Sequence, residues 1–327
     1  MPALWSAAPI GIIDFYGLNR LSQAEARQAL TFKEGDLISF GDGQRAPFLA
    51  ESERRCRVCP ACRRRERTSS VAIGVARLST SASWRMARPS CIFERRRQGH
   101  HASPPDVAAA DDEFSAALVA AVQRGDTEED RSQGHALNHD PRMRVVQERF
   151  IEYAERDLPL LRRVLRESSD PTHRALAAQV LGYAADKQSV VDDLVDALGD
   201  PFDEVRNNAM RTLLVFAEAA PSPSQRVPRV PYQPFIGLLN SPVWSDRNKA
   251  SLALMALSEK RDPALLALLR RDALASLIEM ARWKNAGHAQ AAFIIVGRIA
   301  GYSDAAAQAA WDRGARDAVI SAALNRR

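Results

Sequence analysis

The stretch 170–218, DPTHRALAAQVLGYAADKQSVVDDLVDALGDPFDEVRNNAMRTLLVFAE, decides the fold class of this 327-residue chain. It contains one pattern twice, beginning at Asp170 and at Asp200: an Asp-Pro pair, then an arginine (Arg174 and Arg206), then alanine and leucine in helical register. Aspartate caps the free N–H groups of a helix start, and proline is tolerated at the first helical position. Each copy therefore predicts a helix that begins at a repeat boundary.

Related segments extend the pattern in both directions. Asp140-Pro141 precedes it, and further copies begin at Ser241, with Arg247 at the equivalent place, and at Gly287, where the arginine is missing. Asp262-Pro263 opens a second helix rather than a repeat. The sequence predicts second helices at 189–200, 231–240 and 264–283, and a proline-rich extended loop at 221–234.

Small and branched side chains explain how such helices pack. Alanines allow close approach and leucines fill the remaining space; they include Ala177, Ala178, Ala209, Ala250, Leu181, Leu213, Leu214 and Leu254. One helix pair cannot bury its apolar stripe alone, so neighbouring pairs must stack. We expect the repeated arginine to bind an aspartate or a carbonyl of the adjacent repeat, with a contact to a partner as the alternative.

The Asp-Pro starts, the arginine and the Ala-x-x-Leu seam make residues 140–327 resemble the HEAT-repeat (armadillo-type) domains of bacterial proteins. This resemblance implies a mainly α fold, an α-solenoid of stacked helix pairs, that acts as a non-enzymatic scaffold for a protein partner. Two alternatives come from other HEAT proteins: nucleic-acid binding, as in some DNA-repair glycosylases, and a phycobilisome-lyase-like handling of bilin chromophores.

Residues 1–44 have a different pattern. A strand is predicted at Ile10–Phe15, a helix at 23–30 with Ser22 and Glu25 as a capping box, and a turn at Gly35-Asp36. This order resembles the opening of a polypeptide-transport-associated (POTRA) domain, which implies a small, here incomplete, α+β segment in a protein exported to the periplasm. A generic βα unit is the alternative. The first residues lack a basic region, so they do not predict a signal peptide.

Residues 45–105 form an anomalous segment that holds all four cysteines and no lysine. Thirteen arginines and two acidic residues lie between Arg54 and Arg97, so the net charge of +5 arises from this segment. Nucleic-acid binding by the repeats is correspondingly disfavoured. Neither the strand period nor the helix period persists through it.

Three interpretations of this segment compete. One is a metal site made by Cys56, Cys59 and Cys62, with Cys91 or His100 and His101 as the remaining ligands, although the usual second CxxC pair is missing. The second is a disordered basic linker. The third is translation out of frame, since GC-rich codons for this stretch, taken two bases later, permit strand-like runs broken by turns. We favour the frameshift and expect the segment to be disordered.

Residues 106–139 are predicted as a helix plus a linker. Asp111 or Asp112 starts the helix, Gly125 ends it, and one stripe carries Phe114, Leu118 and Val122. The polar stretch 127–141 is predicted to be a linker or an exposed loop.

Residues with catalytic chemistry are not recognisable. Phosphate-loop, HExxH and GxSxG motifs are missing, and so is any apolar run long enough for a membrane span. We interpret Asp192-Asp193 as a solvated helix face, and Trp244, Trp283 and Trp311 as packing between repeats. The sequence thus predicts no catalytic, cofactor-binding or metal residue.

Overall fold

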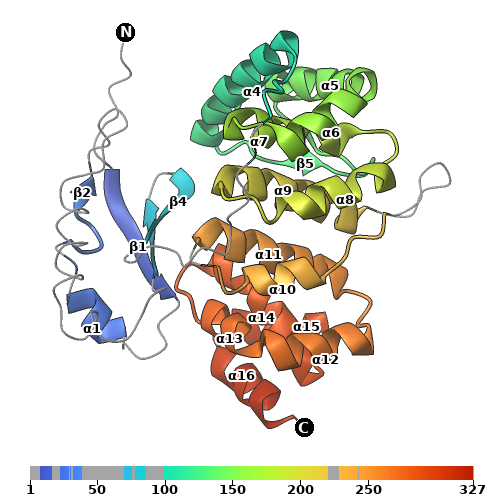
Figure 1. Cartoon of the computed structure of the whole chain (residues 1–327). Helices are drawn as coiled ribbons and strands as arrows, with labels where there is room; N and C mark the ends of the chain where they lie inside the picture. The colour runs from blue at the N-terminus through green and yellow to red at the C-terminus, as the bar shows by residue number, and fades with distance from the viewer. Residues whose placement is uncertain are drawn as a thin grey trace. The chain divides into compact units, whose positions relative to one another are not determined.

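The computed structural model describes residues 8–16, 23–28, 30, 32–38, 70–75, 78–85, 97, 99–219, 228–241 and 243–326 (Figure 1). The chain divides into two compact units. The first comprises 1–90, 240–244 and 274–327, and the second comprises 91–239 and 245–273. The described part is mainly helical, as the repeat pattern predicts.

The second unit consists of successive helices that pack as the alanine and leucine seams require. Its elements are α4 (Pro105–Arg124), α5 (Pro141–Arg156), α6 (Leu158–Glu167), α7 (Pro171–Val180), η1 (Leu181–Tyr183), α8 (Gln188–Ala197), α9 (Asp203–Glu218), α10 (Gln233–Leu238), α11 (Trp244–Leu257) and α12 (Pro263–Asp272). Helix α7 packs against α6 and α9, and α8 packs against the same two helices. Ala177, Ala178, Ala209 and Leu213 are fully buried, so these seams form the core.

Three of the four Asp-Pro pairs open helices as predicted. The carboxylates of Asp140, Asp170 and Asp262 accept backbone N–H groups at the starts of α5, α7 and α12, each with proline at the first helical position. Asp200 differs, because α9 begins at Asp203 and the Asp200 carboxylate bonds the Phe202 N–H outside the helix. The Asp200 carboxylate accepts two hydrogen bonds from Arg174 instead of capping α9.

Helix α4 begins earlier than predicted. Its first residue is Pro105, which places Asp111 and Asp112 inside the helix rather than at its start. The buried stripe carries Val107, Ala110, Ala117 and Ala121, whereas Leu118 is exposed. Phe114 packs against this stripe as predicted, but the stripe continues through Ala117 and Ala121 in place of Leu118 and Val122. Gly125 ends the helix in the left-handed conformation (φ 77°), as predicted.

The stretch 127–141 is a folded hairpin and not an exposed loop, so this prediction was wrong. Strands β5 (Glu129–Asp130) and β6 (Leu137–Asn138) pair antiparallel. Residues 134–138 are buried. Long-range hydrogen bonds hold the backbone: the Tyr183 hydroxyl donates to the Ala136 carbonyl at 2.9 Å, and the Gln147 side chain accepts the Asn138 N–H. Such contacts leave no local sequence signal.

The predicted helix at 264–283 is two helices. Helix α12 ends before Ala273, whose φ of −128° is not helical, and α13 (Leu274–Ala281) follows at once. The other two predicted second helices correspond to α8 and α10. Residues 221–227 of the proline-rich loop lie outside the described part of the chain.

The first unit combines a sheet with C-terminal helices. The sheet has strand order β2-β1-β3-β4, with β1 (Ala8–Tyr16), β2 (Leu37–Ile38), β3 (Ser70–Val75) and β4 (Leu78–Arg85) all paired antiparallel. The helices are α1 (Gln23–Gln28), α13, α14 (Ala286–Ala300), α15 (Asp304–Asp312) and α16 (Arg316–Asn325). The strand and helix predicted at 10–15 and 23–30 therefore exist, while Ser22 lies outside the described residues.

Strand β1 contacts the loop between α13 and α14. The buried carboxylate of Asp14 accepts the backbone N–H groups of Lys284 and Asn285 at 2.8 and 3.0 Å. Asn285 is the residue that precedes α14, so Asp14 satisfies backbone donors at that helix start. Strand β1 and the start of α14 are thus joined by hydrogen bonds between residues 270 positions apart in the sequence.

The segment 45–105 contributes to both units. Strands β3 and β4 belong to it, and so does the stretch after Arg97, which runs along the second unit. Gly99 forms a parallel bridge with Ser168, and the Arg97 guanidinium donates to the Leu165 carbonyl at 2.7 Å. His101 contacts Glu167 at 3.0 Å. The four cysteines lie outside the described residues.

Candidate binding surface

Two of the repeated arginines, Arg174 and Arg206, are buried in the second unit and bind buried aspartates. Arg174 binds the Asp200 carboxylate with two hydrogen bonds, of 2.8 and 2.9 Å, and donates a third to the Ser168 carbonyl. Arg206, the equivalent residue of the next repeat, has the same arrangement, with Asp246 as the carboxylate and Asp200 as the carbonyl. All these side chains are buried. The structural role predicted for the arginines is therefore confirmed, and contact with a partner is not available to them.

Other charged pairs of this kind were missed by the sequence analysis. Asp193 is fully buried and accepts hydrogen bonds from Arg162 and Arg166, so its interpretation as part of a solvated face was wrong. Its neighbour Asp192 is exposed. Arg97 reaches Asp200 at 3.5 Å and thereby adds a second cation to that carboxylate. An arginine spaced four residues before another, as in Arg162 and Arg166, was the available signal.

The tryptophans pack inside the first unit. Trp244 and Trp283 are buried, and the Trp244 ring meets His288 with centroids 4.3 Å apart. The Trp311 ring lies 3.7 Å from the Arg316 guanidinium. These contacts agree with the predicted packing role.

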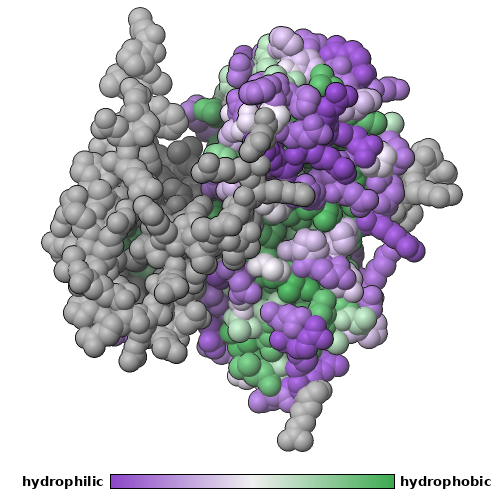
Figure 2. All heavy atoms as spheres, viewed as in Figure 1, coloured by the Kyte–Doolittle hydropathy of each residue, from purple (hydrophilic) through white to green (hydrophobic). Residues whose placement is uncertain are grey.

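A network of surface charges ties the hairpin to α9. The Glu129 carboxylate, at the start of β5, accepts hydrogen bonds from Arg131 and from Arg211 of α9. Arg131 also pairs with Glu218, near the end of α9. These side chains are partly exposed, so the network can contact other molecules. In Figure 2 hydrophilic residues dominate the part of the surface that lies over α4 to α9.

Lys249 of α11 adds a third cation to this network. Among the residues that the structure describes, it has no hydrogen bond or salt-bridge partner, and it is half-buried. Burial, together with the charges of Arg211 and Arg131, lowers the pKa of Lys249 to about 8, while Glu129 acts in the opposite sense. At neutral pH the amine is still mostly protonated. We name Glu129, Arg131, Arg211, Glu218 and Lys249 the charged cluster.

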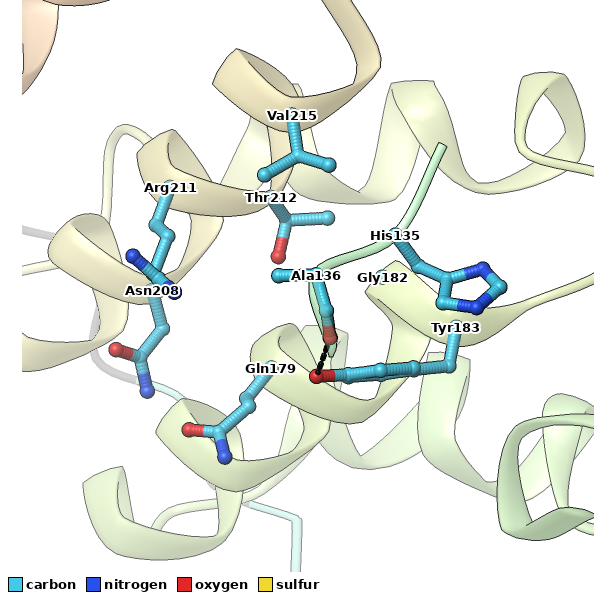
Figure 3. Close-up of a pocket in the computed structure, with 9 residues that line it drawn as sticks. All are labelled: His135, Ala136, Gln179, Gly182, Tyr183, Asn208, Arg211, Thr212 and Val215. Carbon is cyan, nitrogen blue, oxygen red and sulfur yellow. Dashed lines mark hydrogen bonds between the residues drawn. The ribbon is translucent and has the colours of Figure 1, made fainter. Parts of the chain in front are cut away.

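A small cavity lies beside the charged cluster, and Arg211 contributes to its wall (Figure 3). Its volume is about 40 Å³, and its lining is His135, Ala136, Gln179, Gly182, Tyr183, Asn208, Arg211, Thr212 and Val215. Gly182 leaves room for Thr212, because a Cβ at this position would lie 3.0 Å from the Thr212 methyl group. Pockets for drug-sized ligands occupy roughly 300–1,000 Å³. This cavity therefore suits one or two water molecules and not a bilin.

His135 is a buried imidazole on the wall of this cavity. Figure 3 shows it on the opposite side of Ala136 from Gln179, Asn208 and Arg211. Within the described part of the chain, neither of its ring nitrogens has a hydrogen-bond partner. Burial, reinforced by the charge of Lys187, lowers the pKa of His135 to about 4, so it is neutral at physiological pH. The Tyr183 hydroxyl, whose pKa burial raises, is held by Ala136.

Two hydroxyl groups line the cavity, and both donate hydrogen bonds to backbone carbonyls: Tyr183 to Ala136 and Thr212 to Ala178. Within the described residues, no group of three or more His, Cys, Asp or Glu side chains could hold a metal ion. None of the described helices is both long and apolar enough to cross a membrane. The cysteine site of the sequence analysis lies outside the described part.

Comparison with known proteins agrees with the repeat pattern. Residues 158–223, from α6 to beyond the end of α9, match the family model for HEAT repeats. Residues 158–223 therefore contain HEAT repeats. The matched residues include the two copies of the pattern at Asp170 and Asp200 and both buried arginines, Arg174 and Arg206. No curated protein matches the chain. The matched range includes Arg211 and Glu218 of the charged cluster, whereas Glu129, Arg131 and Lys249 lie outside it.

Proposed function

We propose that this protein is a non-enzymatic scaffold whose HEAT repeats bind a protein partner through the charged cluster and the adjacent hairpin. The observation that carries this proposal is the fixed arrangement of exposed cations: Arg131 and Arg211 are both held by Glu129. Side chains that are ordered before binding lose little conformational entropy on binding. HEAT repeats in general mediate protein interactions, which favours the same conclusion.

The chemistry of the surface suits a protein interface. Partly exposed arginines supply hydrogen-bond donors and stacking surfaces, and arginine is enriched among residues that dominate binding energy. Nearby α4 and α5 expose apolar side chains, with Val145 58% accessible. A mixture of oriented charges and apolar contacts is typical of interfaces between proteins.

Chemical cross-linking on the full chain tests the proposal. The chain is incubated with an extract of the cells that produce it, treated with a lysine-reactive cross-linker, and digested for mass spectrometry. We expect the bound partner to protect the half-buried amine of Lys249 from the reagent, while Lys260, an exposed lysine in the turn after α11, reacts in the free and the bound chain alike. Failure to retain any protein, or cross-links only to the first unit, would contradict the proposal.

Nucleic-acid binding stays the alternative function, because the cluster contains three cations. A salt-dependent gel shift with a single-stranded oligonucleotide tests it. The POTRA resemblance of residues 10–40, and the periplasmic export that it implies, remain predictions, since the family match lies elsewhere in the chain. The frameshift in 45–105 also remains a prediction. Sequencing the gene across codons 40–110 tests it directly, and an intact frame there would refute it.

A further inference from the structure

We propose that Lys249 and Arg211 bind a carboxylate of the partner, supplied by an aspartate or glutamate side chain. This inference rests on the proposed function, because it specifies the chemistry of the protein that the HEAT repeats bind. It follows from the charge balance of the cluster and from the packing of α9 against α11. Arg206 of α9 binds Asp246 of α11, and Arg211 and Lys249 follow these two residues on the same helices.

The charged cluster has one cation more than it has carboxylates. Glu129 serves Arg131 and Arg211 together, and Glu218 serves Arg131. Lys249 has no carboxylate of its own among the described residues. One additional carboxylate would make the numbers of positive and negative charges equal.

The surroundings of Lys249 make such a carboxylate favourable. A half-buried ammonium group has lost part of its hydration, and neighbouring arginines raise the cost of its charge. An incoming carboxylate accepts a hydrogen bond from the amine and lowers this cost, because charge-assisted bonds are stronger than neutral ones. Arg211 retains guanidinium donors beyond the Nη2 atom that binds Glu129.

The same pattern argues for a protein carboxylate over a nucleic acid. A nucleic-acid backbone carries closely spaced negative charges, and its binding requires several unpaired cations. Here Glu129 and Glu218 lie among the cations and would repel additional phosphates. One excess positive charge is matched by one carboxylate.

Fluorescence anisotropy with the full chain tests this inference. The probes are a labelled hexaglutamate peptide, a hexaglutamine peptide with the same label, and a labelled single-stranded oligonucleotide. The variants are Lys249→Met, Lys249→Arg and the matched control Lys260→Met, with circular dichroism to verify folding. We expect hexaglutamate to bind about ten-fold more weakly to Lys249→Met than to the wild type, while Lys249→Arg and Lys260→Met retain binding.

Three outcomes would overturn the inference. Equal affinity for hexaglutamate and hexaglutamine shows that no carboxylate is recognised. An equal loss in Lys249→Met and Lys260→Met shows only general electrostatic attraction. Tighter binding of the oligonucleotide, lost in Lys249→Met, assigns the cluster to nucleic acid.

A parallel cross-linking experiment separates this inference from the proposed function. If wild type and Lys249→Met retain the same protein equally well, the HEAT repeats bind a protein but Lys249 does not supply the contact. If neither retains a protein, the proposed function itself fails. If the wild type retains a protein and Lys249→Met does not, while Lys249→Arg does, both hold.

Discussion

Arg206 and Arg211 lie five residues apart on α9 and have opposite surroundings. Arg206 is fully buried and holds Asp246 with bonds of 2.8 to 3.1 Å, besides the Asp200 carbonyl. Arg211 is 36% accessible and shares Glu129 with another arginine. Arg206 has its hydrogen-bond partners inside the fold, whereas Arg211 belongs to a cluster that has one cation more than it has carboxylates.

The difference follows from the cost of burying a charge. An arginine removed from water must have its donors satisfied inside the protein, because an unpaired buried charge costs several kcal/mol. Water satisfies whatever an exposed arginine does not bond. An excess cation is therefore tolerated at the surface, where a partner can bind it, and is not tolerated in the interior. His135 shows another solution to burial: among the described residues it has no hydrogen-bond partner, and it stays neutral.

The largest effect is expected from breaking a buried pair. Arg206→Met should lower the free energy of unfolding by about 3–5 kcal/mol, because the fully buried Asp246 carboxylate loses the guanidinium that binds both of its oxygens. Arg211→Met, on the same helix, should lower it by about 1 kcal/mol or less. Urea denaturation at pH 7 measures both. Similar losses for the two variants would show that burial does not distinguish these arginines.

A pH dependence is expected from His135. Its pKa is lowered to about 4 in the folded chain, from an ordinary value of 6.5, so the unfolded state binds more protons between these values. Stability should fall as the pH drops from 6.5 to 4, by up to about 3 kcal/mol from this residue. His135→Leu should remove that loss.

The comparison of wild type with His135→Leu must be made at each pH. Asp111, whose pKa burial raises to about 6, acts in the opposite direction as the pH falls from 6 to 3.8. Its contribution is common to both proteins and cancels in their difference. A difference that does not change between pH 7 and pH 4.5 would refute the assignment.

A smaller effect is expected from Glu129→Gln. This change removes the carboxylate that Arg131 and Arg211 share, so the two cations repel and stability should fall by about 1 kcal/mol. Hexaglutamate should bind a few-fold more tightly, since the cluster becomes more positive. Glu128→Gln, at the exposed neighbouring position, is the control and should change neither quantity appreciably. Weaker peptide binding in Glu129→Gln would contradict the role of the excess cation.

The smallest effect is expected from Lys249→Met. The pKa of Lys249 is lowered to about 8, so its charge opposes folding below that pH. The variant should have unchanged or slightly higher stability at pH 7, by about 1 kcal/mol at most. Thermal and urea unfolding measure this. A clear destabilisation would mean that the amine has a structural partner and would weaken its assignment to binding.

Much of the helical fold was predictable because its signals are local. The Asp-Pro caps at Asp140, Asp170 and Asp262 involve groups two or three residues apart, and the alanine and leucine seam follows the helical period. Errors occurred where distant residues decide. The start of α4 and the split between α12 and α13 differ from prediction, and the hairpin 127–141 had been assigned to an exposed loop.

The candidate site was not predictable from the chain alone. The sequence determined that residues 140–327 contain helical repeats with arginine at equivalent places, since cap, period and spacing are properties of neighbouring residues. Only the tertiary structure decided which arginine meets which carboxylate, because Arg206 and Asp246 are forty residues apart and Arg211 and Glu129 are eighty-two apart. It also decided that Lys249 lies among these charges without a carboxylate of its own within the described part, because burial and pairing depend on packing between segments distant in sequence.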